Sequence, residues 1–326
     1  MSFSMSATMM DVILQQEEQG RQQQCRGQYS FCSTVFDTKD FSLPSTLEAM
    51  RHQEESFYAI RGDYLAQRGN GHQEIAVDYG NRESMTEWQY KIVEFLDFSH
   101  ETVEISMNYL NQFLLTPAGE KALACTKTFQ LANMACLYLG IKCHEEIVLD
   151  SKFMANLSHN LFTYDQVEAM ELKILFALGF RVNPPTSPAF VRELIELLPR
   201  SVSEETKRKV FTLCEPQVQI AVIDYNFINV KASTIALFAL LNSLRVLGMD
   251  AVLLNHIGSL LTYASRIDPE SLQEEIQDRL YDAVIDYSDI TGLAERNECG
   301  AISPDTQKEY MSQRDACDGS PCGVCS

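Results

Sequence analysis

The feature that constrains the fold most is one long segment that is apolar on almost every side. It runs from Lys121 to Lys142 and reads KALACTKTFQLANMACLYLGIK. A surface helix has one apolar stripe, whereas a helix that is apolar all round is enclosed by its neighbours. The chain has no run of about 18 apolar residues, the length that crosses a membrane. We therefore expect this helix at the centre of a helical bundle, and we expect no membrane partner.

The segments on either side have helical spacing and helical end signals. Apolar residues recur every three to four positions in RESMTEWQYKIVEFL, from Arg82, and in ETVEISMNYLNQFLL, from Glu101. A later helix begins at Thr163, where Gln166 completes a capping box, and ends at Gly179. The first half of the chain is therefore predicted to be a helical unit.

A second series of helices begins after the proline-rich stretch NPPTSP. Convincing β-alternation longer than a few residues does not occur in the sequence. The predicted fold class is all-α, with two consecutive units of about five helices each, joined at residues 183 to 188. The expected helix starts in the second unit are Ser187, Ser203, Ser233, Asp250 and Asp268.

The predicted organisation has further parts at both ends. The segment LEAMRHQEESFYAIRGDYLAQ is expected to form one helix that ends near Gly69. The N-terminal residues are rich in Gln, Ser and Met and have little periodicity, which is typical of disorder. Three cysteines in the tail are interpreted as free thiols, because a zinc site needs ligands at matched spacing. The predicted parts are a disordered segment at 1–45, an N-terminal helix region at 46–80, helical units at 81–184 and 185–290, and a disordered tail at 291–326.

Charge and composition exclude several classes of function. The formal net charge is −19 and the pI is about 4.7, so most of the surface repels a nucleic-acid backbone. We therefore expect no nucleic-acid partner. The N-terminus lacks the basic-then-apolar order of a signal peptide. Most of the 10 cysteines are scattered singly, as in proteins of a reducing compartment, so the expected location is intracellular.

Two charged residues break the apolar pattern. Glu171 falls inside the buried stripe of its helix, and Lys142 ends the central apolar segment 29 residues earlier. Burial of an unpaired charge costs several kcal/mol, so both residues need partners. Either they form a polar spot at the edge of a hydrophobic binding surface, or Glu171 simply pairs with a lysine that extends from a helix C-terminus. The pattern leaves both interpretations open.

The run CHEE that follows Lys142 contains residue types that bind metals. A zinc-protease helix needs a second histidine four residues after His144, where Val148 stands instead. Neither a G-x-S-x-G motif nor a glycine-rich phosphate loop occurs. We expect no catalytic residue, no metal site and no cofactor. The chain is therefore predicted not to be an enzyme. A metal-dependent helical enzyme built on His144, Glu145 and Glu171 is the weakest alternative.

Several motifs together resemble the cyclins, the regulatory subunits of cyclin-dependent protein kinases. The family's R-x-x-x-x-x-W opening is similar to Arg82 to Trp88, and ETVEISMNYLNQFL resembles its second helix. FQLANMACLYLGIKCHEE and TYDQVEAMELKILFALGFRVNPPT resemble two later helices, without a gap between Gln130 and Phe180. The resemblance covers the first unit and implies two consecutive five-helix cyclin folds with a preceding N-terminal helix.

The resemblance assigns roles to the two charges. Lys142 and Glu171 match the lysine and glutamate that cyclins present to the kinase. It implies a heterodimer with a cyclin-dependent kinase, which the chain would bind and activate without a cofactor of its own. The other kinase contacts implied by the same comparison are Glu145, Leu175, Phe180 and Val182.

The second unit resembles the family less sharply. VKASTIALFALLNSL is similar to a helix of D-type cyclins, and EESFYAIRGDYL resembles their N-terminal helix. The resemblance therefore implies a divergent, D-type-like cyclin that acts at the G1/S transition and is located in the nucleus and cytoplasm. The alternative is a cyclin-fold transcription or scaffold adaptor that does not activate a kinase.

Some positions depart from the family pattern. The aspartate that usually pairs with the first-helix arginine is Asn111, so Arg82 needs another acceptor. The first glutamate after the lysine is His144. The substrate-docking run of the family aligns with NRESM, where polar residues replace apolar ones. The residues left for contacts with kinase substrates or inhibitors are Met85, Trp88 and Gln130.

Overall fold

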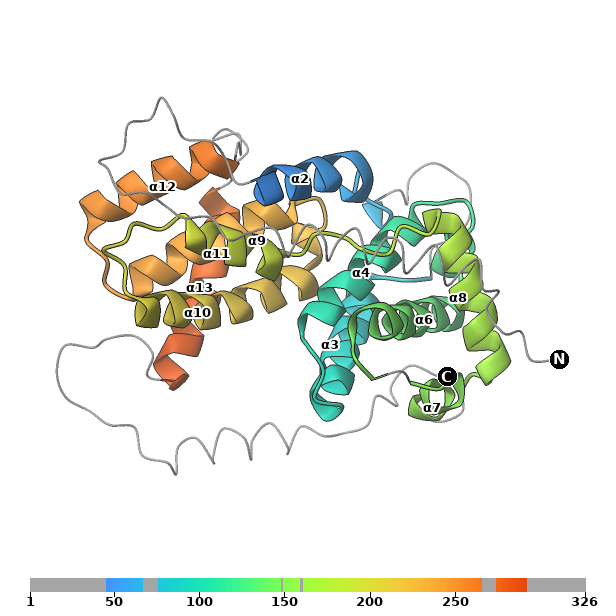
Figure 1. Ribbon diagram of the computed structural model, residues 1–326. Coiled ribbons are helices and arrows are strands. Elements are labelled where there is room, and N and C mark those ends of the chain that lie inside the picture. The colour runs from blue at the N-terminus through green and yellow to red at the C-terminus, as the bar shows by residue number, and fades with distance from the viewer. Residues whose placement is uncertain (1–44, 67–75, 148, 159–160, 266–273, 292–326) are drawn as a thin grey trace.

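All regular elements in the described part of the chain are helices, as predicted. The computed structural model describes residues 45–66, 76–147, 149–158, 161–265 and 274–291 (Figure 1). The helices form two units side by side, one from each half of the sequence. Both terminal segments that were predicted to be disordered lie outside the described residues, except for Ser45 and Thr291. None of the described helices has the length and apolar character of a membrane span.

The first unit contains the predicted central helix. Its helices are α3 (Tyr79–Phe95), α4 (Glu101–Leu114), α5 (Glu120–Leu123), α6 (Thr126–His144), α7 (Ser151–Leu157) and α8 (Tyr164–Leu178). α6 packs between α4 and α8 and is buried on nearly every side from Ala132 to Ile141. This burial follows from a helix that is apolar all round.

The second unit repeats this plan around α11. Its elements are α9 (Ser187–Glu196), α10 (Glu204–Ile223), the turn η3 (Tyr225–Phe227), α11 (Ala232–Val246), α12 (Ala251–Ser265) and α13 (Glu274–Thr291). α9, α10 and α13 surround α11. The helix starts predicted near Ser187, Ser203, Ser233 and Asp250 are confirmed, and the start at Asp268 lies outside the described residues.

Local sequence determines both ends of α8. The Thr163 side chain accepts a hydrogen bond from the Gln166 backbone N–H, and the Gln166 side chain accepts one from the Thr163 N–H. This is the predicted capping box. The helix ends at Gly179, whose φ of 60° lies in the left-handed region that glycine adopts without strain. Both predicted ends are confirmed.

The N-terminal helix is shorter than predicted. α2 (Ser45–Gln53) continues as a π-helical turn, η1 (Glu54–Tyr58), and stops there. Leu47 packs in the core of the second unit, whereas Leu65 lies in the core of the first. The chain therefore leaves the helix at Ala59, which is extended, and crosses from one unit to the other. Local apolar spacing does not reveal that the two ends of this segment serve different cores.

The segment predicted as one helix over 121–142 is divided into α5 and α6. Cys125 has extended backbone angles, φ −146° and ψ 112°, which separate the two helices. The apolar pattern hides this break because Leu123 of α5 and Phe129 of α6 belong to the same core. The predicted central position therefore belongs to α6 alone.

Polar contacts join the two units. Arg192 of α9 and Glu101 of α4 form an ion pair with an N–O distance of 3.0 Å. His100, just before α4, lies 2.7 Å from a carboxylate oxygen of Glu215 in α10. This hydrogen bond raises the pKa of His100, because it favours the protonated ring.

Candidate functional site

Lys142 and Glu171, the two charges that break the apolar pattern, meet in the structure. Lys142 Nζ lies 2.7 Å from Glu171 Oε1. Glu171 is only 7% exposed, whereas the Lys142 side chain keeps 22% of its surface exposed. The pair therefore lies at the edge of the first-unit core, with the carboxylate inside and part of the lysine accessible. Two of the predicted site residues, one from α6 and one from α8, are thus in direct contact.

Tyr138 holds Lys142 from a second side. The centre of its ring lies 4.8 Å from Lys142 Nζ, within the range of a cation–π contact. Burial raises the pKa of Tyr138 to about 12, and the carboxylate of Glu171 adds to the rise. Tyr138 was not predicted, although its spacing of one helical turn from Lys142 signals that the two share a face of α6. The lysine is thus positioned before any partner binds.

The apolar residues predicted beside this pair lie at different depths. Leu175 and Val182 are buried in the first-unit core, and Phe180 is half-buried at its edge. Leu175 shares the buried stripe of α8 with Glu171, as their spacing predicts. The exposure of Leu175, Phe180 and Val182 does not test whether they bind a kinase, so that role stays a prediction.

Phe180 has an unusual backbone conformation. It follows Gly179 and also has a φ of 60°, a region that residues with a side chain rarely adopt. Its N–H donates to the Leu175 carbonyl at 3.0 Å, which closes the end of α8. The Phe180 ring packs edge-to-face against Phe176, with ring centres 5.4 Å apart. Backbone strain of this kind clusters at functional sites.

Exposed apolar side chains extend this surface along α8. Phe176 is 66% exposed and Leu172 is 46% exposed. They are four residues apart and therefore share one face of the helix. Neither was predicted, although both are apolar residues outside the buried stripe. We call Leu172, Phe176 and Phe180 the α8 apolar face; exposed apolar groups that gather in this way are typical of a protein-binding surface.

Glu145 and His144 bind within the chain. Glu145 Oε1 accepts hydrogen bonds from the Ser99 N–H, at 3.0 Å, and from the Thr102 hydroxyl. His144 Nε2 lies 2.8 Å from the Val182 carbonyl oxygen. The two side chains therefore have different partners, and the described residues contain no group of three His, Cys, Asp or Glu side chains arranged for a metal ion. The predicted kinase contact of Glu145 stays a prediction.

The predicted docking residues lie on two helices that contact each other, α3 and α6. Met85 and Trp88 of α3 are half-buried against the first-unit core. Gln130 of α6 is half-buried as well. All three keep some accessible surface, and their role in binding substrates or inhibitors stays a prediction.

Arg82 finds its acceptors in the second unit. Its Nη1 and Nη2 atoms donate to the carbonyl oxygens of Ile223 and Val222, at 2.6 and 3.0 Å. These carbonyls belong to the last turn of α10, where the C=O groups have no N–H donors within the helix, and a cation there suits the helix dipole. Asn111, which replaces the family's aspartate, accepts from the Tyr64 hydroxyl instead. The expectation that Arg82 needs another acceptor is confirmed.

Comparison with known proteins identifies the family of the first unit. The profile described as Cyclin, N-terminal domain matches residues 45–183. The G2/mitotic-specific cyclin-2 of Saccharomyces cerevisiae is 26% identical over 221 residues, which are 68% of this chain and 40% of that protein. The G1/S-specific cyclin-E of Caenorhabditis elegans is 25% identical over 122 residues, which are 37% of this chain and 23% of that protein. The chain spans less than half the length of either relative.

A solved structure extends the likeness beyond that domain. A viral cyclin from herpesvirus saimiri aligns with 74% of this chain and 96% of its own, with a TM-score of 0.57 and 18% sequence identity. Such an alignment reaches past residues 45–183 into the second unit, so both units share the fold of that structure. With the helix order and the matched motifs, these findings show that residues 45–183 form a cyclin N-terminal domain and that the chain is built as two consecutive cyclin folds preceded by an N-terminal helix, and they support a divergent cyclin.

Proposed function

We propose that this protein is the regulatory subunit of a cyclin-dependent serine/threonine kinase, which it binds as a heterodimer and activates. The observation that carries the proposal is the Lys142–Glu171 pair, whose carboxylate comes from the same helix as the α8 apolar face. A partly accessible charged pair with exposed apolar surface on the same helix suits a partner that offers both polar backbone groups and apolar side chains. The cyclin N-terminal domain makes a cyclin-dependent kinase the expected class of partner.

The charged pair would bind backbone groups of the kinase. An ammonium group has three N–H donors, and Glu171 accepts from Lys142 through Oε1. Donors of Lys142 therefore remain for carbonyl oxygens of the partner. Since Glu171 and Tyr138 already position the lysine, binding costs little additional ordering of this side chain.

The α8 apolar face would bind the mobile αC helix of the kinase. Burial of Leu172, Phe176 and Phe180 against that helix would favour the complex through removal of apolar surface from water. The αC helix would then stay where its glutamate meets the ATP-site lysine. The function is thus a shift in the conformational population of the kinase. Phosphoryl transfer stays in the kinase, so this chain is a non-catalytic subunit that needs no cofactor.

We further propose that the protein acts at the G1/S transition, in the nucleus and cytoplasm. The resemblance of VKASTIALFALLNSL to a D-type helix supports this assignment. Substrates or inhibitors of the kinase would dock at Met85, Trp88 and Gln130. In synchronised cells, a tagged protein should reach its highest level before S phase. A maximum at mitosis would contradict the proposed stage and leave the regulatory role intact.

The direct test combines the purified chain with a purified, cyclin-free cyclin-dependent kinase. The dissociation constant is measured by calorimetry, and activation is measured as phosphorylation of histone. The variant Lys142→Ala/Glu171→Ala removes both partners of one ion pair and leaves neither charge buried alone. We expect this variant to lose affinity by more than about tenfold while its circular dichroism and thermal unfolding remain close to wild type.

The control removes a Lys–Glu ion pair of similar length that lies within one helix and has an exposed carboxylate. Lys207 and Glu204 of α10 pair at 2.8 Å, far along the sequence from the proposed interface. Lys207→Ala/Glu204→Ala should bind and activate the kinase as the wild type does. Equal binding by both double variants would show that Lys142 and Glu171 form an internal contact only. Binding by the wild type without activation would instead favour the scaffold adaptor.

A further inference from the structure

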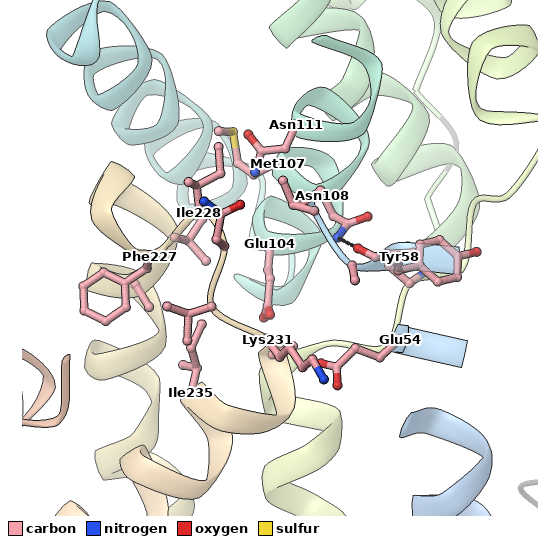
Figure 2. Close-up of a pocket in the computed structure, with 18 of the residues that line it drawn as sticks. Glu54, Tyr58, Glu104, Met107, Asn108, Asn111, Phe227, Ile228, Lys231 and Ile235 are labelled. Atoms are coloured by element: carbon pink, nitrogen blue, oxygen red, sulfur yellow. Dashed lines mark hydrogen bonds between the residues drawn. The ribbon is translucent and has the colours of Figure 1, made fainter. Parts of the chain in front are cut away.

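A pocket lies where the two units and the N-terminal helix meet. Its volume is about 470 Å³, and its lining comes from η1, α4 and the stretch from Phe227 to Ile235 (Figure 2). A pocket of this size holds a small organic molecule. Its lining contains neither Lys142 nor Glu171, so it is separate from the proposed kinase contacts.

Glu104 projects into this pocket from α4. Its Oε1 atom accepts two hydrogen bonds from Ser187, one from the backbone N–H at 2.8 Å and one from the hydroxyl at 2.7 Å. Its Oε2 atom is buried and has no hydrogen-bond partner within the protein. A buried carboxylate oxygen without a donor is costly, because it loses its water and gains nothing in return. The pocket therefore contains an acceptor that lacks a donor.

The electrostatic surroundings show which kind of donor Glu104 lacks. Burial raises the pKa of Glu104 to about 7, and the carboxylates of Glu101 and Glu54 add to the rise. Glu54 itself is satisfied, since its two oxygens accept from the Ser233 N–H and hydroxyl at 2.9 and 2.6 Å. Two carboxylates thus line one pocket, and a positively charged donor would favour the ionised form of Glu104.

The cations that line the pocket are already engaged elsewhere. Arg82 donates from its two Nη atoms to carbonyl oxygens at the end of α10, and its buried Nε has no hydrogen-bond partner among the described residues. Lys231 pairs with Glu55 at 3.1 Å, and Arg61 donates to the Glu55 carbonyl at 2.8 Å. Tyr58 is the remaining titratable group of the lining, and burial raises its pKa, so it stays neutral near pH 7.

Apolar side chains form the other walls of the pocket. Met107 of α4 faces Ile228 and Ile235 of the second unit across it. We infer that this pocket binds a small organic cation, an amidinium or ammonium group on an apolar body, and that Glu104 Oε2 accepts the hydrogen bond from the charged nitrogen. The apolar body would contact the side chains of Met107, Ile228 and Ile235.

The test uses three probes of equal shape and different charge: benzamidine, benzamide and benzoate. Each is titrated into the full chain while the methyl resonances of Met107, Ile228 and Ile235 are followed by NMR. We expect benzamidine to shift these methyl groups and to bind more than about tenfold more tightly than benzamide, because its bond to the carboxylate is charge-assisted. Benzoate should not bind. Equal affinities for benzamidine and benzoate would overturn the proposal.

Variants and pH then test the acceptor itself. Glu104→Gln keeps an oxygen for Ser187 but removes the charge. Benzamidine should therefore bind the variant more than about tenfold more weakly than it binds the wild type, with an affinity close to that of benzamide. Glu87→Gln, an exposed change on α3, serves as the control and should bind as wild type does. If Glu104→Gln does not fold, the wild type still decides: benzamidine should bind more tightly at about pH 8 than at about pH 6, since protonation removes the charge of Glu104. A flat pH profile, or full affinity in Glu104→Gln, would refute the assignment.

Discussion

Glu104 and Ser187 are joined by two hydrogen bonds that cross from the first unit to the second. One oxygen of the α4 carboxylate accepts both the backbone N–H and the hydroxyl of Ser187, at the first residue of α9. Glu54 accepts the N–H and the hydroxyl of Ser233, one at each carboxylate oxygen, in the first turn of α11. The first N–H groups of a helix have no acceptor within the helix, and negative charge there is favourable. Two acidic residues distant in sequence thus cap the helices of the second unit.

Ser187→Ala should destabilise the protein by about 1 to 2 kcal/mol. The substitution removes the hydroxyl that donates to Glu104 and leaves the carboxylate with fewer donors in a buried place. The free energy of unfolding is measured by urea denaturation. Ser259→Ala is the control, because Ser259 is exposed on α12 and its hydroxyl bonds only to its own helix. A loss of the same size in both variants would show that the contact between the units contributes nothing of its own.

The stability of the protein should fall as pH rises through neutrality because of Glu104. Folding raises the pKa of this carboxyl from 4.5 to about 7, so between these values the folded chain holds more protons than the unfolded chain. Stability therefore decreases across this window as pH rises. The contribution is on the order of 3 kcal/mol.

Glu104→Gln isolates this contribution. The wild type should lose unfolding free energy as pH rises from about 5 to about 8, and the variant should lack this loss. The free energy of unfolding of the variant minus that of the wild type should therefore increase with pH across this range. The raised pKa of His100 also makes stability fall as pH rises, but His100 is present in both proteins and cancels in the difference. A constant difference between the two proteins across this range would contradict the assignment to Glu104.

Arg82→Lys should cost more stability than Arg192→Lys, although both arginines bridge the two units. Arg82 is buried and its planar fork reaches two carbonyl oxygens, which a single ammonium group does not reproduce. We expect a loss of about 2 to 3 kcal/mol. Arg192 is half exposed in its ion pair with Glu101, so its replacement should cost less than about 1 kcal/mol. Denaturant titrations of both variants test this order, and equal losses would contradict it.

Phe180→Asn should separate stability from kinase binding. Asparagine tolerates the left-handed φ of 60° better than phenylalanine does, which offsets the packing lost against Phe176. The free energy of unfolding should therefore stay within about 1 kcal/mol of wild type. Affinity for the kinase should fall by more than about tenfold, because the α8 apolar face loses a ring.

Calorimetry with the kinase and thermal unfolding of the same samples measure the two effects. Phe211→Asn on α10 provides an exposed phenylalanine outside the proposed interface as the control. Retained affinity in Phe180→Asn would remove Phe180 from the interface.

The sequence alone determined the all-α class, the two units and the ends of individual helices. Thr163 with Gln166 marks the start of α8, and Gly179 marks its end, because capping and left-handed turns depend on neighbouring residues only. Helical spacing likewise placed Glu171 within a buried stripe. These features depend on contacts within one or two helical turns.

The partners that those residues meet depend on how distant parts of the chain pack together. Arg82 lies 140 residues before the Val222 carbonyl that it binds, and Glu104 lies 83 residues before Ser187. The end of the N-terminal helix at Tyr58 also depends on distant contacts, because the two ends of this segment pack in different hydrophobic cores. Local pattern records which side of a helix is buried, whereas the partner of a buried polar group depends on how the faces of distant helices come together.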